Sequence, residues 1–408
     1  MQQKQPQMKA KHLSKVQRLS LDRISTLPQT IIETILCLLP IEEAARTSIL
    51  SREWRFKWTT IPKLVFSYST LERPSSENRL SLIDWDKTYD SSRCKLFYAI
   101  HQVLLLHQGP IHEFTLLTSA DDTFFEIDQI ILHLSRNHTL KKLTLGFCET
   151  GVYKLPSSVF SLHHLTDLDL EWCDINHKQI FNGSFGSLTS LSLREVGISK
   201  ETLLHLLSKC PSLKRLCLFI MDFILYYERP NIMELFKFLP VIEHLSIWGY
   251  TIPSFVHASV PEVPPASLIH LKYIYIDFMC FVDGYGLPFL ADLIKCSPNL
   301  EKIQLRIRGY EDGDETEPDK LGEHSLILEE YSDVWLEHLK DLEIDFFGNR
   351  KPELEFMKFI LARSPNLKKV ELRVLIYDKK EELEMTKTLL RTPRASPVEI
   401  IVHDHYQV

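Results

Sequence analysis

Residues 165–175 read LTDLDLEWCDI, with apolar side chains at the first, fourth and sixth positions. Side chains two apart on an extended chain face the same side, so Leu168 and Leu170 predict a short strand with one buried face. The same spacing recurs at ten places, at intervals of 23 to 29 residues apart from one of 39. The first residues of these ten segments are 111, 140, 165, 188, 213, 242, 271, 300, 339 and 367. So many matches at near-regular spacing are not expected by chance.

Most of these intervals match the period of leucine-rich repeats, which is roughly 20 to 29 residues. Residues 165–175 fit the full pattern L-x-x-L-x-L-x-x-C-x-I. An apolar helical run that ends in a proline turn precedes several segments, as in residues 203–213, 289–300 and 359–367. Proline disfavours helix for the residue before it, so each unit reads helix, turn, strand. The predicted fold is α/β, a curved leucine-rich-repeat solenoid with the strands inside.

The strand period also predicts a binding face. In each segment the fourth and sixth residues point into the core, so the third, fifth and seventh point out of the concave face. Four large aromatic side chains fall on such positions of neighbouring strands: Phe219, Trp248, Tyr273 and Tyr275. Exposed Trp and Tyr side chains often mark interfaces, so these residues are predicted to bind a target. The alternative is that a loop or the C-terminal segment covers them.

Near the start of the chain, residues 27–58 are unusually apolar. The pattern predicts a first helix from Pro28 to Leu39 with Ser25 or Thr26 as its cap, a second over residues 41–48 and a third over residues 51–58. Apolar residues of the first helix cover an arc of about 160°, wider than the roughly 100° stripe of a one-sided helix. Residues 22–58 are too few to bury this excess alone, so another part of the chain or another protein must cover it.

Residues 22–58 resemble the F-box of plant F-box proteins across the whole motif. The shared elements are the opening D-R-I-S-x-L-P, the L-P after the first helix, A-x-R-T-S-x-L-S and the closing W-R-x-x-W. The resemblance implies a three-helix domain that binds a Skp-type adaptor, which links it to the cullin and RING subunits of a ubiquitin ligase. The adaptor contacts implied are Leu27, Pro28, Ile31, Ile35, Leu38, Leu39 and Pro40. Trp54 and Trp58 are expected to hold the three helices together.

Residues 335–374 are similar to the FBD region of plant F-box proteins, and TPRASPVEIIV at residues 392–402 fits its closing segment. The chain is thereby identified as a member of the plant F-box/FBD/leucine-rich-repeat family. The domains expected are a disordered basic tail (1–20), an F-box (21–60), a linker and capping segment (61–110), repeats (111–334) and an FBD-like region that continues the solenoid (335–408).

Charge and motifs exclude several other classes of protein. The net charge is −7, and residues 21–60 carry five basic and five acidic residues, which disfavours a DNA-binding helix-turn-helix. The basic tail fits a solvated disordered segment or a nuclear-import signal, and the acidic run EDGDETEPD fits a solvated insertion better than a calcium site. The eight cysteines lack zinc spacing and read as reduced core thiols. No apolar run is long enough for a membrane span.

No nucleotide-binding, metalloprotease or hydrolase motif is present, so no catalytic residue, metal or cofactor is expected. The expected function is that of a non-catalytic substrate receptor of an SCF-type cullin-RING ubiquitin ligase, in the nucleus or cytoplasm. It would accelerate transfer by proximity, holding a target near the conjugating enzyme. The alternatives are an interaction scaffold that is not engaged in ubiquitination, or a receptor gated by a small molecule.

Overall fold

A computed structural model describes residues 24–67, 82–118, 125–136, 138–147, 153–175, 185–220, 232–249, 252, 268–281, 286–308, 331, 333–348, 350–374 and 379–404. The chain divides into two compact units, Met1–Cys148 (unit 1) and Glu149–Val408 (unit 2). In each unit the long strands are parallel, and the apolar side chains on one side of these strands are buried. The predicted basic tail (1–20), residues 69–79 of the predicted linker and capping segment (61–110), and the acidic insertion lie outside the described residues.

Unit 1 begins with short helices and continues into a parallel sheet, in which β1 pairs with β2 and β2 with β3. Its elements are α2 (Gln29–Leu36), α3 (Ile41–Arg46), the 3₁₀ helices η1 (Thr47–Ile49) and η2 (Lys57–Thr60), β1 (Lys63–Ser67), α5 (Leu82–Leu106), β2 (Glu113–Thr118), α6 (Phe125–Ser135) and β3 (Lys142–Phe147). Strand β1 starts three residues after the end of η2. The segment between them also contacts the residue after α5, because Nε2 of His107 lies 2.9 Å from the carbonyl oxygen of Ile61. The N-terminal helices are therefore continuous with the first strand of this sheet.

The N-terminal helices differ from the prediction in three respects. Helix α2 ends at Leu36 rather than Leu39, because the next residues form tighter turns with bonds from Leu38 N to the Ile35 oxygen and Leu39 N to the Leu36 oxygen. Its N-cap is Pro28 without a side-chain cap, so neither Ser25 nor Thr26 has that role. The prediction of a third α-helix over residues 51–58 was wrong. Residues 52–56 form turns that lead into η2.

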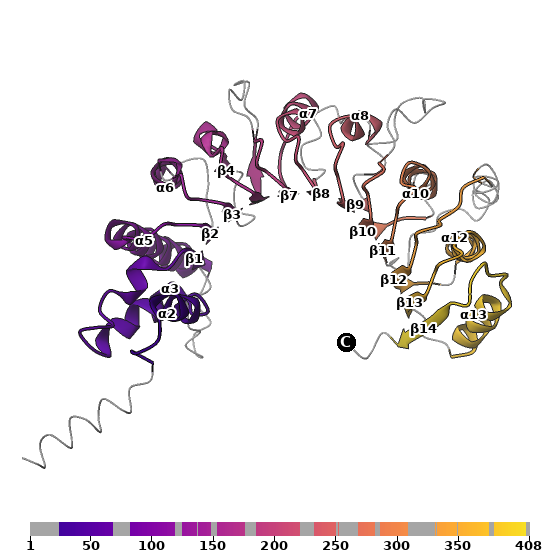
Figure 1. Ribbon diagram of the computed structural model, residues 1–408, viewed down its shortest axis with the longest axis horizontal. Coiled ribbons are helices and arrows are strands. Elements are labelled where there is room, and N and C mark those ends of the chain that lie inside the picture. The colour runs from indigo at the N-terminus through magenta and orange to yellow at the C-terminus, as the bar shows by residue number, and fades with distance from the viewer. Residues whose placement is uncertain are drawn as a thin grey trace, which may run out of the picture. The chain divides into compact units, whose positions relative to one another are not determined.

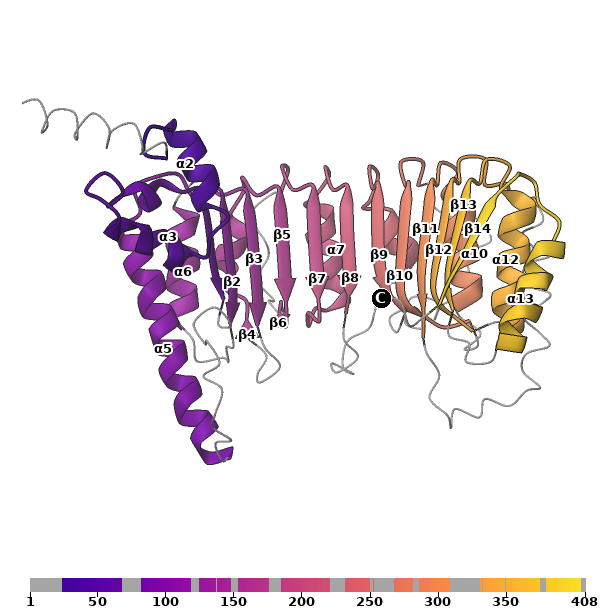
Figure 2. The same cartoon turned by 90° about the horizontal axis from the view of Figure 1, so that it is seen from below.

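Unit 2 is a solenoid in which strands pair in chain order, all parallel, from β5 through β7 to β14 (Figure 2). Figure 1 shows these strands along the inner side of an arc with α7, α8, α10, α12 and α13 outside. The elements are β4 (Tyr153–Lys154), η3 (Ser157–Ser161), β5 (Asp167–Glu171), β6 (Cys173–Asp174), β7 (Ser190–Arg194), α7 (Lys200–Ser208), β8 (Arg215–Phe219), α8 (Ile232–Phe236), β9 (His244–Trp248), β10 (Tyr273–Met279), α10 (Gly286–Lys295), β11 (Lys302–Ile307), β12 (Asp341–Phe347), α12 (Lys351–Arg363), β13 (Lys369–Val374), α13 (Lys379–Arg391) and β14 (Glu399–Asp404).

All ten predicted segments form strands, and each strand begins two residues after the first residue of its segment. Burial alternates as predicted, for example in β5, where Leu168 and Leu170 are buried and the residues beside them are half-exposed. The predicted helix, turn and strand order is confirmed at α7, α10 and α12. Strand β1 was not predicted, although Ile61, Leu64 and Phe66 have the same spacing.

Strands β10 and β12 each contain a bulge near their C-terminal ends. Phe278 and Phe346 have φ of 54° and 59°, and the pairing register shifts there. Left-handed backbone is a rare conformation for a bulky side chain. Each bulge places two consecutive side chains, an Asp and a Phe, on the half-exposed side of the strand. Two aromatic rings are thereby added to the concave face.

Charged side chains alternate in sign along a rim just before the strands of unit 2. The rim residues are the second residues of five consecutive segments, namely Lys214, Glu243, Lys272, Glu301 and Lys340. Ion pairs join Lys214 to Glu243 at 2.8 Å, Lys272 to Glu301 at 3.7 Å and Lys340 to Glu301 at 2.6 Å. The backbone N–H of each rim residue from Glu243 to Lys340 also donates a hydrogen bond to the carbonyl oxygen of the preceding rim residue. Each rim residue is therefore bonded to the preceding one through the backbone, and three of the four neighbouring pairs also form an ion pair.

Candidate binding surfaces

The first surface lies on α2 and the turn that follows it. Ile32 and Leu36 are buried, whereas on the adjacent side of the helix Ile31 is 46% exposed and Ile35 is 39% exposed. Leu38 is 81% exposed. Of the seven predicted adaptor contacts, Pro28, Ile31, Ile35, Leu38, Leu39 and Pro40 are exposed and Leu27 is half-buried. The rest of the described chain therefore covers only one side of this wide apolar arc.

Further apolar side chains are exposed close by in sequence. Ile49, Leu50 and Phe56 are all mostly exposed, and none was predicted as a contact. The signal was present, because Ile49 and Leu50 lie within the A-x-R-T-S-x-L-S element. Among the described residues, fourteen of the eighteen exposed large apolar side chains belong to unit 1. Large exposed apolar patches mark protein interfaces, so unit 1 carries the stronger candidate for docking.

Trp54 and Trp58 belong to the interior of this unit, as predicted. Both side chains are buried, and Trp54 Nε1 donates a 2.7 Å hydrogen bond to Ser25 Oγ. Ser25 therefore satisfies the indole N–H instead of capping α2.

The second surface is aromatic and lies on the concave face of unit 2. Phe219, Trp248, Tyr273 and Tyr275 are all half-exposed, at the strand positions predicted. The ring centroid of Phe219 lies 6.4 Å from those of both Trp248 and Tyr275, and the ring of Trp248 meets Phe278 edge-on at 6.0 Å. Three strands, β8 to β10, thus contribute to one patch of mutually packed rings.

An arginine on the next strand, β11, contacts the edge of the aromatic patch. The Arg306 guanidinium on β11 lies 5.4 Å from the Phe278 ring centroid and 5.1 Å from that of Phe346. Its ion pair with Asp277 is 3.7 Å long. Sequence reasoning missed Phe278 and Phe346, because a regular strand would have turned both side chains inward.

Burial perturbs the ionisable groups of this patch. Burial, helped by the charge of Asp277, raises the pKa of Tyr275 to about 12. Burial also raises the pKa of Asp277, against the opposing effect of Arg306. Tyr273 donates a 2.7 Å hydrogen bond to Gln304 Oε1, and burial raises its pKa. The patch therefore keeps two neutral phenols beside a carboxylate that is largely shielded from water.

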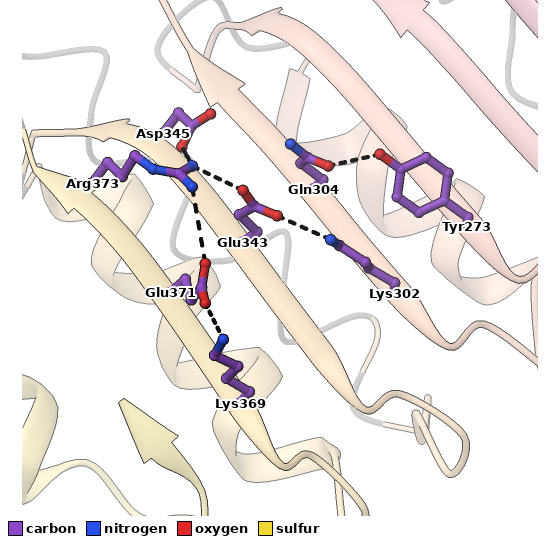
Figure 3. A network of polar contacts seen from close by, with 8 residues as sticks. All are labelled: Tyr273, Lys302, Gln304, Glu343, Asp345, Lys369, Glu371 and Arg373. Carbon is purple, nitrogen blue, oxygen red and sulfur yellow. Dashed lines mark hydrogen bonds and ion pairs between the residues drawn. The ribbon is translucent and has the colours of Figure 1, made fainter. Parts of the chain in front are cut away.

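A network of ion pairs follows on β11 to β13 (Figure 3). Glu343 accepts hydrogen bonds from Lys302 at 3.0 Å and from Arg373 at 2.8 Å, and Arg373 also pairs with Asp345. Burial raises the pKa of Glu343, but the bonds from Arg373 and Lys302 outweigh this effect, and the net shift is downward. Arg373 therefore neutralises carboxylates that are largely shielded from solvent.

Arg373→Gln is expected to lower the free energy of unfolding by about 1.5 to 2 kcal/mol at pH 7, because it removes charge-assisted hydrogen bonds to Glu343 and Asp345. The folded-state pKa of Glu343 is depressed. The stabilisation that Glu343 contributes is therefore fully present at pH values above its unfolded-state pKa of about 4.3. It is lost as the pH falls through the lower pKa of the folded state. In urea unfolding, the difference in the free energy of unfolding between Arg373→Gln and the wild type should narrow toward pH 3.

The control is Lys340→Gln at an exposed rim residue, which should change the free energy of unfolding by less than about 0.5 kcal/mol. If Arg373→Gln lowered the free energy of unfolding equally at pH 7 and at pH 3, this account would be contradicted.

No group of acidic, histidine or cysteine side chains suited to a metal occurs among the described residues. None of the helices in the described ranges is long and apolar enough to cross a membrane. Of the seven described cysteines, Cys173, Cys210 and Cys296 are buried, whereas Cys94 is exposed, so the prediction of core thiols was wrong for Cys94.

Comparison with known proteins agrees with these features. Three family profiles match, namely the F-box domain over residues 24–66, LRR repeats of the FBD-associated F-box protein At5g56370 over residues 129–235, and the FBD over residues 335–372. The F-box/FBD/LRR-repeat protein At1g13570 of Arabidopsis thaliana is 33% identical over 92% of this chain and 97% of its own length. The chain belongs to the F-box/FBD/LRR-repeat family. The predicted family and fold class are thereby confirmed.

Other relatives share smaller parts of the F-box/FBD/LRR-repeat chain. The Arabidopsis F-box/FBD/LRR-repeat protein At3g26920 is 30% identical over 48% of this chain and 41% of its own length, so this chain spans less than half of that relative. Among solved structures, the leucine-rich repeat-containing protein LegL7 of Legionella pneumophila is similar at 14% identity and a TM-score of 0.38, covering 71% of this chain and 93% of its own.

Proposed function

We propose that this F-box/FBD/LRR-repeat protein is a non-catalytic substrate receptor of an SCF-type cullin-RING ubiquitin ligase. Its F-box binds a Skp-type adaptor, and the concave face of unit 2 binds a target protein. The observation that carries the proposal is the exposed apolar side of α2, which the described part of the chain leaves uncovered. Burying such side chains in a partner gains about 25 cal/mol per Å² of apolar surface.

The adaptor contacts proposed are Leu27, Pro28, Ile31, Ile35, Leu38, Leu39 and Pro40. We place Ile35 and Leu38 at the centre, because Ile31 and Ile35 lie one turn apart on the exposed side of α2 and Leu38, in the turn after the helix, is the most exposed of the three. Pro28 and Pro40 flank them at the two ends of the helix and its turn. The domain ranges proposed remain 21–60 for the F-box, 111–334 for the repeats and 335–408 for the FBD-like region.

Ile35→Ala is expected to weaken adaptor binding at least about 30-fold, since loss of a central apolar anchor costs about 2 kcal/mol or more. Ile35→Ala with Leu38→Ala should abolish co-purification with a Skp-type adaptor and, through it, with cullin. The measurement is isothermal titration of the purified chain with a Skp-type adaptor, with co-purification from cells as the second readout.

A matched control is Leu105→Ala on α5, because Leu105 is 77% exposed but lies outside the F-box. Binding by this variant should be unchanged. Full adaptor affinity in the double mutant would remove the proposal and leave the interaction scaffold as the better reading. A receptor gated by a small molecule predicts adaptor binding as well, but its target binding would depend on an added compound.

A further inference from the structure

The concave face of unit 2 carries more carboxylates than cations. We define this face by the third, fifth and seventh positions of the strand segments from β5 to β14. Its cations are Arg194, Arg215, Lys302, Arg306, Lys369 and Arg373. Its carboxylates are Asp167, Asp169, Glu171, Asp277, Asp341, Glu343, Asp345, Glu371 and Glu399. The nine carboxylates exceed the six cations by three negative charges, without counting histidines.

Every one of these cations is already paired on the same face. Arg194 pairs with Asp169 at 3.0 Å and with Glu171 at 3.2 Å, and Arg215 pairs with Asp167 at 3.1 Å. Towards the other end, Lys302 and Arg373 both pair with Glu343, Arg306 pairs with Asp277, and Lys369 pairs with Glu371. An incoming phosphate would have to break one of these ion pairs to reach a cation.

Some carboxylates of the same face have no such partner. Neither Asp341 nor Glu399 forms an ion pair with a described residue, although both interact with Lys369 at longer range. Asp277 accepts a 3.0 Å hydrogen bond from the backbone N–H of Phe278, and its ion pair with Arg306 is 3.7 Å long. A cation brought by a partner would therefore find two carboxylates without an ion pair to a described residue, Asp341 and Glu399, and a third, Asp277, that is only weakly paired.

The aromatic patch offers such a cation a surface on which to stack. No described cation lies over the ring of Phe219 or Tyr275, and both rings are half-exposed. Arg306 shows the same chemistry one strand further along, since its guanidinium lies between the rings of Phe278 and Phe346 beside Asp277. Arginine or lysine over an aromatic face is attracted by the negative ring face.

We propose that the target segment received by this face is basic and unphosphorylated, with a lysine or arginine that stacks on Phe219 and Tyr275 and reaches towards Asp277. The proposal rests on the proposed function only in that this face binds a target. Recognition of a phosphorylated or acidic segment depends on clusters of cations that are available to the ligand. The described cations of this face are instead held by its own carboxylates.

The test uses the full chain bound to its adaptor and an array of synthetic twelve-residue peptides. The peptides have equal apolar content, net charges from strongly negative to strongly positive, and phosphoserine versions of each serine peptide. Retention at physiological salt is expected to rise with positive charge and to fall with each phosphoserine. Stronger retention of acidic or phosphorylated peptides, or equal retention at every charge, would overturn the proposal.

Variants separate the aromatic patch from general attraction to a negative face. Tyr275→Ala and Asp277→Asn should each weaken retention of basic peptides about tenfold, whereas Tyr275→Phe, which keeps the ring, should stay close to wild type. Glu384→Gln on α13, outside the defined face, is the control for net charge. Basic peptides that bind Tyr275→Ala as well as wild type would show that no ring takes part. Adaptor binding and melting temperature are measured on the same samples. A wild-type chain that binds its adaptor but shows no preference for positively charged peptides would reject this inference and leave the proposed function standing.

Discussion

Trp54→Ala is expected to lower the free energy of unfolding of unit 1 by about 3 to 5 kcal/mol, the range for truncating a buried aromatic side chain. Trp54 is 7% exposed, and the substitution removes both its ring from the interior and the hydrogen bond from Nε1 to Ser25. Adaptor binding should fall in parallel with folding, because the exposed side of α2 depends on the helices behind it. Urea unfolding followed by circular dichroism measures the change.

Phe56→Ala provides the matched control, since Phe56 lies two residues away and is 59% exposed. Removal of an exposed ring leaves no cavity, so its stability should change by less than about 0.5 kcal/mol. Loss of adaptor binding by Trp54→Ala with unaltered helicity and stability would instead assign Trp54 to the interface.

Gly249→Ala is expected to destabilise unit 2 by about 3 kcal/mol, at the upper end of the cost of overpacking. A methyl group at residue 249 would lie 2.1 Å from the carbonyl oxygen of Phe278 and 2.6 Å from its carbonyl carbon. These are backbone atoms of the bulge in β10, so no side-chain rotation relieves the clash. Moving the bulge would also separate the rings of Trp248 and Phe278.

The control for this variant is Gly348→Ala, which lies just after the other bulged strand, β12. The nearest atoms to a methyl group there are the Glu353 carboxylate oxygens at 3.6 Å, an ordinary contact distance. Thermal unfolding of both variants should therefore show a large drop in melting temperature for Gly249→Ala alone. Similar melting temperatures would mean that the β10 bulge yields without strain.

Eight strands of unit 2, β5 and β7 to β13, were predictable because one rule governs each of them, whereas β4, β6 and β14 lie outside the ten predicted segments. The fourth and sixth residues of a segment, such as Leu168 and Leu170, must be apolar whatever the neighbouring repeats contain, so the signal is local. The exposed contacts on α2 were predictable for a related reason. Ile31 and Ile35 add apolar surface beyond what Ile32 and Leu36 need to pack the helix.

Features that depend on partners distant in sequence were not predictable. Trp54 and Trp58 are four residues apart, which suits a helix, but the ring of Trp54 reaches Ser25 and the segment folds into turns. The bulges at Phe278 and Phe346 lie within β10 and β12, whose preceding residues follow the ordinary alternating pattern. The bond between Arg373 and Glu343 spans 30 residues and requires the strand register. In each case tertiary contacts outweigh the local pattern.

Because the rim residues of unit 2 alternate between lysine and glutamate, the number of repeats between two of them decides whether their charges attract or repel. Excision of one unit, residues 271–299, would set Glu243 beside Glu301, whereas excision of two, residues 271–338, would set Glu243 beside Lys340. A single exposed pair contributes only about 0.2 to 1 kcal/mol, but the sign reverses with each unit removed. Gene rearrangements that remove an even number of units between Lys214 and Lys340 would thus preserve the charge pairing of the rim, and those that remove an odd number would not.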